Sequence, residues 1–332
     1  MILSNQSIPS QQQSASGQIP IISYKSTTEE RKHEIRSALT SVGFFYLVDH
    51  PLVSDMRKAF EYSKKFFDLP FEVKNQFHTL KGGSGYISKS SERLNGTDID
   101  LKEAYNVRLQ NSPNDQGEEV NYFPDETQFL NLEGFEKFSK DLFNALHDLL
   151  CEILDDLQSS LTIQNKTRGS TEPLENNYFS STHSDKEHSL RYLHYPKIDK
   201  NNLSSSASDR NGAGLHCDYG SITLLFQDDV GGLQVLNRVT NEMMNAPYVP
   251  DSMIVNCGDL MQEWTSGEYK SVPHQVVLTN YDRDRYSIAY FGQPNKDCYI
   301  SSIDMTAYDY LMKKFEKSYT IKQQSKTTTT TP

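Results

Sequence analysis

The chain has 332 residues, of which 36% are hydrophobic and 23% are charged, and its formal net charge is −11. This length is sufficient for a substantial core, as in an enzyme domain with a helical attachment. Lys and Arg are scattered along an acidic chain, which disfavours binding to nucleic acids or to anionic membrane surfaces. No apolar run approaches the roughly 20 residues that a membrane helix needs. We therefore expect a small-molecule partner, and favour a monomer.

Four cysteines, at positions 151, 217, 257 and 298, form no C-x-x-C pair. With no apparent signal peptide, they indicate reduced thiols. We expect a cytoplasmic location, with the nucleus as the second option.

The predicted elements of the N-terminal half alternate between helix and strand. Residues 1–17 and 321–332 are polar and of low complexity, and we expect two disordered tails. Thr27 and the acids after it open a helix that Gly43 ends. Further predictions are a strand at Phe44–Val48, a helix at Val53–Phe67 ending before Pro70, a short helix at Phe71–Phe77 and a flexible glycine-rich loop at Lys81–Tyr86, near the mouth of the site.

In the second half, an amphipathic pattern from Thr127 to Leu161 predicts a helix or a helix pair. Ser221–Gln227 and Leu233–Leu236 are predicted strands joined by a glycine-rich turn. Ile303–Tyr319 is a predicted helix that ends the folded part.

The candidate metal ligands are His216, Asp218 and His274. In a strand, residues two apart point to the same face, so His216 and Asp218 can reach one ion while Cys217 points away. His274 would come from another strand that folds back over the first. Two His and one carboxylate on one side of an ion leave the opposite positions free, as in non-haem Fe(II) oxygenases.

A second His-x-Asp, His183-Ser184-Asp185, lies in a polar stretch without apolar alternation. We interpret it as a solvated loop that binds no metal, and we expect the remaining histidines to be solvated or locally hydrogen-bonded.

Arg285 and Ser287 alternate with Ala289 and Phe291 onto one face of a predicted strand. A buried Arg and a hydroxyl on one face suit a carboxylate ligand, because Arg offers a bidentate fork and Ser one further donor. The alternative is an internal salt bridge to an Asp or Glu of this acidic chain.

These motifs resemble the Fe(II)/2-oxoglutarate-dependent oxygenase superfamily, and most of all its isopenicillin-N-synthase-like branch. Other phrases that match run from Ile19 to Lys317: Ile19–Ser23, Gly43–His50, Asp100–Ala104, Leu190–Pro196, Val255–Trp264 and Gly267–Ser271. Two departures, Asp49-His50-Pro51 and Leu193, bear only on the subfamily.

The resemblance implies an α+β fold with a double-stranded β-helix, or jelly-roll-like, core, an N-terminal helical region and a C-terminal helix. It implies these boundaries: an N-terminal α/β region at 18–165, the core at 166–300 and the C-terminal helix at 301–320.

By the same resemblance, His216, Asp218 and His274 would be both the Fe(II) ligands and the catalytic residues. Arg285 and Ser287 would hold the distal carboxylate of 2-oxoglutarate. Tyr195 matches a position whose phenol reaches that co-substrate, although it could equally be a core aromatic at a strand end. The implied activity is an oxidoreductase, a dioxygenase that uses Fe(II), 2-oxoglutarate and dioxygen to hydroxylate or desaturate a small organic substrate.

Three alternatives stay open on the sequence. In the oxidase members of the branch, Arg-x-Ser binds the substrate itself, and no 2-oxoglutarate is consumed. A non-catalytic homologue could have kept the fold to sense a metabolite. A zinc hydrolase would also suit three ligands, although it would not need Arg285 and Ser287.

Overall fold

The computed structural model describes residues 18–79, 83–89, 100–109, 122–159, 161, 177–197, 211–278 and 282–314. Both predicted tails and part of the glycine-rich loop lie outside these residues. No helix in the described ranges is long and apolar enough to cross a membrane.

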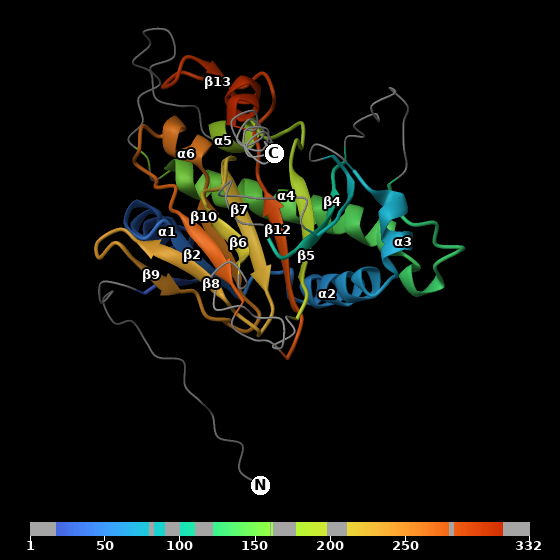
Figure 1. Ribbon diagram of the computed structural model, residues 1–332. Coiled ribbons are helices and arrows are strands. Elements are labelled where there is room, and N and C mark those ends of the chain that lie inside the picture. The colour runs from blue at the N-terminus through green and yellow to red at the C-terminus, as the bar shows by residue number, and fades with distance from the viewer. Residues whose placement is uncertain are drawn as a thin grey trace, which may run out of the picture.

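Two antiparallel-rich sheets form the centre of the molecule (Figure 1). The larger sheet has the order β1-β2-β10-β7-β12-β5-β4-β3, and the smaller sheet has the order β6-β11-β8-β9. The strands of the larger sheet are β1 (Ile21–Ser23), β2 (Phe44–Val48), β3 (Gly85–Ile87), β4 (Glu103–Val107), β5 (Ser189–Tyr195), β7 (Ile222–Gln227), β10 (Met253–Cys257) and β12 (Arg285–Phe291). Those of the smaller sheet are β6 (Asn211–His216), β8 (Leu233–Asn237), β9 (Glu242–Asn245) and β11 (His274–Val277).

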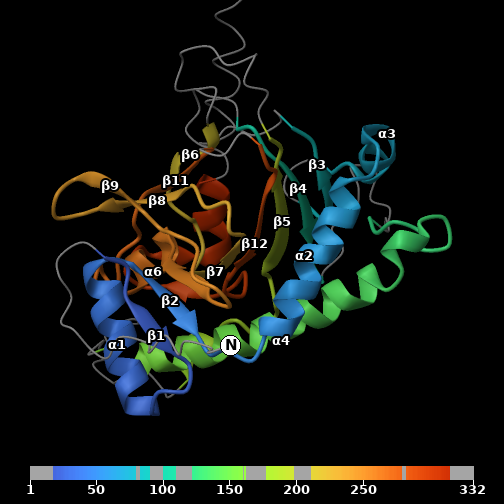
Figure 2. The same ribbon diagram turned by 90° about the horizontal axis from the view of Figure 1, so that it is seen from below.

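The helices are α1 (Thr28–Ser41), α2 (Val53–Phe67), α3 (Phe71–Lys74), α4 (Phe135–Ser159), α5 (Tyr178–Ser181) and α6 (Asp259–Trp264). The longest, α4, runs along the side of the larger sheet that faces away from β8 and β9 (Figure 2). A short hairpin, β13 (Tyr299–Ile300) with β14 (Met305–Thr306), precedes a helix at residues 307–314.

The alternation of side chains along the larger sheet divides the core in two. On β12, Tyr286, Ile288 and Tyr290 join the core beneath the helices, whereas Ala289 joins a second core between the two sheets. The second core also takes side chains from β6, β8 and β11. This is the two-layer sandwich expected of a double-stranded β-helix.

Several predicted elements are confirmed to the residue. The structure has a strand at Phe44–Val48, a helix at Val53–Phe67 and a capping box between Thr27 and Glu30 at the start of α1. Gly43, with φ of +80°, ends that region, and a Cβ there would collide with Val272 Cγ2. Only glycine fits this position without displacing the segment that leads to His274.

Two predicted helices are shorter than expected. The helix predicted from Thr127 starts at Phe135, because Gly134 takes φ of +76° and Leu130–Leu132 form a separate 3₁₀ turn. The helix predicted from Ile303 is described at 307–314, after β14, and Thr306 Oγ1 accepts a hydrogen bond from Asp309 N at its start. Its predicted continuation lies outside the described residues.

Candidate metal centre

His216 and His274 lie side by side on neighbouring strands. They form a directly paired register position between β6 and β11, and their ring centroids are 4.4 Å apart. His274 also packs edge-on against Phe44 of the inter-sheet core, at 5.4 Å. The two rings therefore meet between the sheets, as the prediction of a strand folded back on the first required.

Asp218 reaches the same point by a route that differs from the prediction. β6 ends at His216, so Asp218 lies beyond the strand, and simple alternation along one strand does not place it. Its main-chain carbonyl instead accepts a hydrogen bond from Asp259 N, at 2.7 Å. In this position Asp218 Oδ1 lies 3.9 Å from Nε2 of both histidines, and the three candidate ligand atoms lie within 4.8 Å of one another.

Hydrogen bonds determine which atoms of this cluster remain available. His216 Nδ1 donates to Gly214 O at 2.7 Å and His274 Nδ1 donates to Val272 O at 3.1 Å, so each neutral ring keeps an Nε2 lone pair. Asp218 Oδ2 accepts one hydrogen bond from each of two donors, Thr223 Oγ1 and Asn256 Nδ2, both at 2.7 Å. Two nitrogen lone pairs and one carboxylate oxygen thus converge, a donor set that suits Fe(II).

The electrostatics of His216 and Asp218 favour a neutral imidazole beside an ionised carboxylate. Burial, and next the neighbouring His274, lower the pKa of His216 well below its usual value. Burial alone would raise the pKa of Asp218, but His274, His216, Asn256 and Thr223 together hold it below its usual range. An unprotonated imidazole and an ionised carboxylate are the forms of these side chains that bind a cation.

Thr223 on β7 and Asn256 on β10 were not identified from the sequence. Thr223 follows Asp218 by five residues, but it lies on a strand of the facing sheet, and Asn256 is 38 residues away, so alternation along one strand indicates neither. Asn256 does fall within the Val255–Trp264 phrase that carried the family resemblance, but the resemblance assigned it no role.

Arg285 is fully buried at the start of β12. Its guanidinium donates to Gly231 O at 2.5 Å, to Ser287 Oγ at 3.3 Å and to Gln227 Oε1 at 3.3 Å. Within the described ranges no carboxylate forms a direct ion pair with it, but Asp228 lies near enough to interact electrostatically with its charge. A buried guanidinium with only neutral hydrogen-bond partners retains the capacity to bind an anion.

Tyr195 is the last residue of β5 and pairs directly with Arg285 across the sheet. The Arg285 guanidinium lies over the Tyr195 ring, 4.6 Å from its centroid. Both sequence interpretations of Tyr195 are compatible with this geometry, since the ring is buried in the inter-sheet core and still contacts Arg285.

The prediction that His183 lies in a solvated loop is wrong. His183 is in a turn after α5 but has no exposed surface. Its Nδ1 donates to Phe179 O at 2.6 Å, and its Nε2 accepts from Ser221 Oγ at 2.8 Å. Both ring nitrogens are thereby occupied, so His183 is a structural residue and remains outside the metal cluster. Local sequence polarity failed here because one of the two partners, Ser221, comes from a distant segment that covers the ring.

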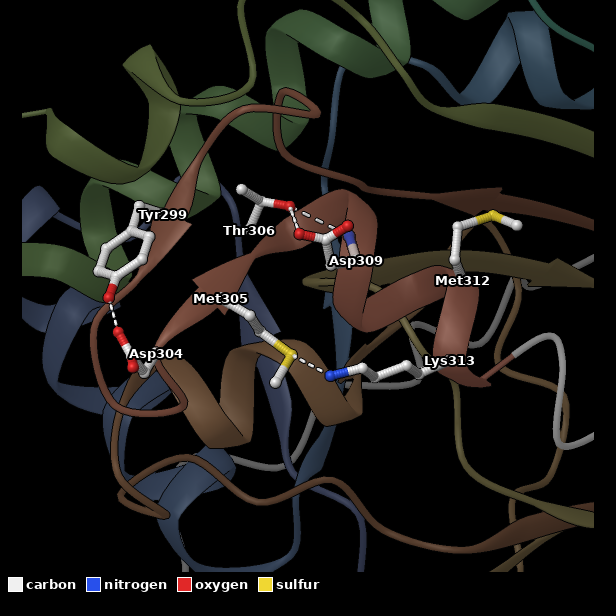
Figure 3. A pocket seen from close by; sticks show the side chains of 7 residues that line it. All are labelled: Tyr299, Asp304, Met305, Thr306, Asp309, Met312 and Lys313. Atoms are coloured by element: carbon white, nitrogen blue, oxygen red, sulfur yellow. Dashed lines mark hydrogen bonds between the residues drawn. The ribbon is translucent and has the colours of Figure 1, made fainter.

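A surface hollow at the C-terminal hairpin is separate from the metal centre (Figure 3). Its polar side chains bond to one another: Tyr299 with Asp304, and Thr306 with Asp309 at 2.8 Å. None of the candidate ligands lines it.

Comparison with known proteins matches this architecture. The family model of the 2OG-Fe(II) oxygenase superfamily matches residues 174–294, and that of the non-haem dioxygenase in morphine synthesis N-terminal region matches residues 19–126. The proline hydroxylase buaE of Petromyces alliaceus is 30% identical over 314 residues, which are 85% of this chain and 92% of that protein. The chain belongs to the 2OG-Fe(II) oxygenase superfamily.

Other members are similar over comparable lengths. A 2-oxoglutarate-dependent dioxygenase of Didymella fabae is 31% identical, over 86% of this chain and 89% of that protein. The crystal structure of a full-length Neurospora crassa protein in complex with alpha-KG (2-oxoglutarate) and thymine superposes with a TM-score of 0.77 at 28% identity, covering 91% of this chain and 97% of that one. The isopenicillin-N-synthase-like branch is consistent with these matches.

The chain is thus an oxidoreductase, an Fe(II)/2-oxoglutarate-dependent dioxygenase with the α+β, jelly-roll-containing fold of its superfamily. Its cofactor is Fe(II) and its co-substrate is 2-oxoglutarate. This finding favours the main functional prediction over a 2-oxoglutarate-independent oxidase.

Proposed function

We propose that His216, Asp218 and His274 hold the Fe(II), and that Arg285 and Ser287 bind the distal carboxylate of 2-oxoglutarate. The observation that carries the proposal is the convergence of three unprotonated donor atoms, each fixed by a hydrogen bond at another atom of its side chain. When bound, the iron supplies the site for oxidative decarboxylation of 2-oxoglutarate and for oxidation of the substrate.

The role of Arg285 follows from charge. Burying a guanidinium whose hydrogen-bond partners are all neutral is costly, and an incoming carboxylate compensates that cost. Ser287 Oγ accepts from Arg285, which leaves its own hydroxyl hydrogen free to donate to the same carboxylate. Tyr195 supports the guanidinium through its ring face, and we assign it to this co-substrate site.

Part of the inter-sheet wall is apolar, whereas Arg191 and Asn106, which pair in register on the same face as Ala289, add polar groups. Ala289 and Leu193 belong to the inter-sheet core, and Phe291 packs against it. Such a wall excludes water from the reacting atoms and leaves the shape of the remaining space to select the substrate.

We propose a small organic molecule as the substrate. The Neurospora crassa protein is named in a complex with thymine and buaE is named a proline hydroxylase, which points to small molecules of different chemistry. The experiment is oxygen uptake with Fe(II) and 2-oxoglutarate across a panel of free amino acids, nucleobases and plant or fungal metabolites. A member of the panel whose oxidation is stoichiometric with succinate identifies the substrate class, whereas oxygen uptake that never yields succinate would contradict the assignment of Arg285 and Ser287.

We also propose a cytoplasmic location. All four cysteines are free, and the thiols of Cys257 and Cys298 are buried, as expected of a chain that is not disulfide-bonded.

A further inference from the structure

Each candidate histidine ligand depends on a carbonyl of its own segment. His216 donates to Gly214 O and His274 donates to Val272 O, in both cases two residues earlier in the chain. The direction in which each Nε2 points therefore depends on how firmly those two stretches of backbone are held.

Asp100 holds the first stretch. Its Oδ1 accepts from Gly214 N at 3.1 Å, on the same residue whose carbonyl receives His216, and from Asn211 Nδ2 at 3.3 Å. Leu101 N also donates to Asn211 O, at 2.9 Å. The segment that leads into β4 of the larger sheet thus binds the open edge of β6. Asp100 is buried and forms an ion pair with buried Lys102 at 2.7 Å.

Asp259 holds the second stretch in a similar way. Its Oδ1 accepts from Ser271 Oγ at 2.7 Å, and Ser271 immediately precedes Val272. Its Oδ2 pairs with Lys314 Nζ of the C-terminal helix at 2.6 Å. Its backbone N–H donates to the Asp218 carbonyl. One residue of α6 therefore contacts the segments that carry two of the three ligands.

We propose that Asp100 and Asp259 are positioning residues of the metal centre, each neutralised by a lysine from outside the double-stranded β-helix. The Asp100–Lys102 ion pair is buried, and such pairs add little net stability but have a fixed geometry because an unsatisfied partner is so costly. The Asp259–Lys314 pair is half-buried, and Asp259 is held in addition by its hydrogen bonds to Ser271 and Asp218. Asp100 holds Gly214 and Asp259 holds the residue before Val272, and the carbonyls of Gly214 and Val272 orient the imidazoles of His216 and His274. The N-terminal region and the C-terminal helix thereby contribute to metal affinity although neither contains a ligand. The inference rests on the ligand set proposed above.

The test measures metal binding directly. Asp100→Asn, Ser271→Ala and Ser271→Thr are each titrated with Mn(II) by calorimetry, and the absorption spectrum of the Co(II)-loaded protein reports the ligand geometry. The Asp100 carboxylate accepts from Gly214 N with one oxygen and from Lys102 with the other, whereas an asparagine has a single acceptor oxygen. The Asn variant therefore loses one of these two interactions. We expect Asp100→Asn and Ser271→Ala to bind Mn(II) about 10–100-fold more weakly with a shifted Co(II) spectrum, the range typical of lost outer hydrogen bonds.

Ser271→Thr keeps the hydroxyl and should restore affinity to within about threefold of wild type. Asp141→Asn, which removes an exposed ion pair with Lys137 on α4, is the matched control and should change neither readout. Wild-type affinity and an unshifted spectrum in folded Asp100→Asn and Ser271→Ala would overturn the inference. If His216→Ala also bound Mn(II) normally, the ligand set itself would fail. If only His216→Ala lost binding, the ligands would stand and the positioning role would fall.

Discussion

His216, Asp218 and His274 each use one polar atom to hold their own orientation and leave another atom for a ligand. His183, in the second His-x-Asp motif, cannot serve as a metal ligand in the same way, because both of its ring nitrogens already form hydrogen bonds. Residue type and spacing predict candidate metal ligands, and the hydrogen bonds of each candidate then show whether a donor atom remains free to bind a metal.

Replacing any one of the three candidate ligands by alanine should abolish stoichiometric Fe(II) binding and activity while the fold survives. The ligands act as one unit, whereas the helices and sheets keep their own apolar cores. Calorimetric titration with Mn(II) checks this outcome for His216→Ala, Asp218→Ala and His274→Ala. Wild-type affinity in any one of them would remove that residue from the set.

Arg285→Ala should raise the apparent KM for 2-oxoglutarate steeply and leave Mn(II) affinity within a few-fold. Loss of a buried bidentate Arg costs about 3–5 kcal/mol, which is a factor of about a hundred or more. Ser287→Ala removes one neutral donor and should cost about 1 kcal/mol. Succinate formation measured over a range of 2-oxoglutarate concentrations separates the two variants. Equal KM values in wild type and Arg285→Ala would mean that the carboxylate binds elsewhere.

At the scale of elements, the sequence predicted helices and strands best where the periodicity and end signals lie within the segment itself. Val53–Phe67 has helical periodicity and is followed by Pro70, and the structure has a helix over this range. In Arg285–Phe291 the residues alternate between two faces, and the structure has a strand over this range. The early start predicted for α4 was wrong because the apolar pattern alone does not reveal a left-handed Gly134.

Local sequence patterns could not predict the contacts between segments that are far apart in the chain. Asp218 lies past the end of β6 and is placed by α6, and its carboxylate is held by Thr223 and Asn256 from other strands. The same limitation produced the error at His183, whose polar neighbours in sequence are not its neighbours in space. The candidate ligands were predicted from the sequence, whereas the contacts that orient them required the fold.

His183→Ala should lower the free energy of unfolding by about 2–4 kcal/mol, because it leaves a buried cavity and two unsatisfied partners, Phe179 O and Ser221 Oγ. Metal affinity at neutral pH should stay close to that of wild type, since His183 contacts no candidate ligand. Urea denaturation and Mn(II) titration of the same preparation test both parts. Unchanged stability would indicate that the ring is not buried in solution.

At the scale of the whole molecule, three buried histidines lie where α4, α5 and the larger sheet meet. His188 Nε2 donates to His147 Nδ1 at 3.1 Å while its Nδ1 accepts from Gln293 N, and the rings of His183 and His188 stack. Burial lowers the pKa of His183 to about 4, and also lowers the pKa values of His147 and His188. All three are neutral in the folded protein at pH 7.

Because these pKa values are lower in the folded than in the unfolded chain, the unfolded state binds more protons as the pH falls. The associated stability is present above about pH 6.5 and is lost as the pH falls toward about 4. The destabilisation caused by His183→Ala should therefore shrink between pH 7.5 and pH 5, by up to about 1.4 kcal/mol per pH unit below 6.5. Urea denaturation of wild type and variant at several pH values measures this difference. A gap that widens on acidification would contradict the assignment of a neutral buried ring.

The most direct test of the account is the amount of succinate formed from 2-oxoglutarate by wild type and by Asp218→Ala, with and without added Fe(II). We expect iron-dependent succinate formation by wild type, stimulated by a substrate from the panel, and none above background by Asp218→Ala. Succinate formed equally by both proteins would contradict the proposed metal centre. Oxygen consumption by wild type without any succinate, and impaired by Arg285→Ala, would contradict the use of 2-oxoglutarate at this site.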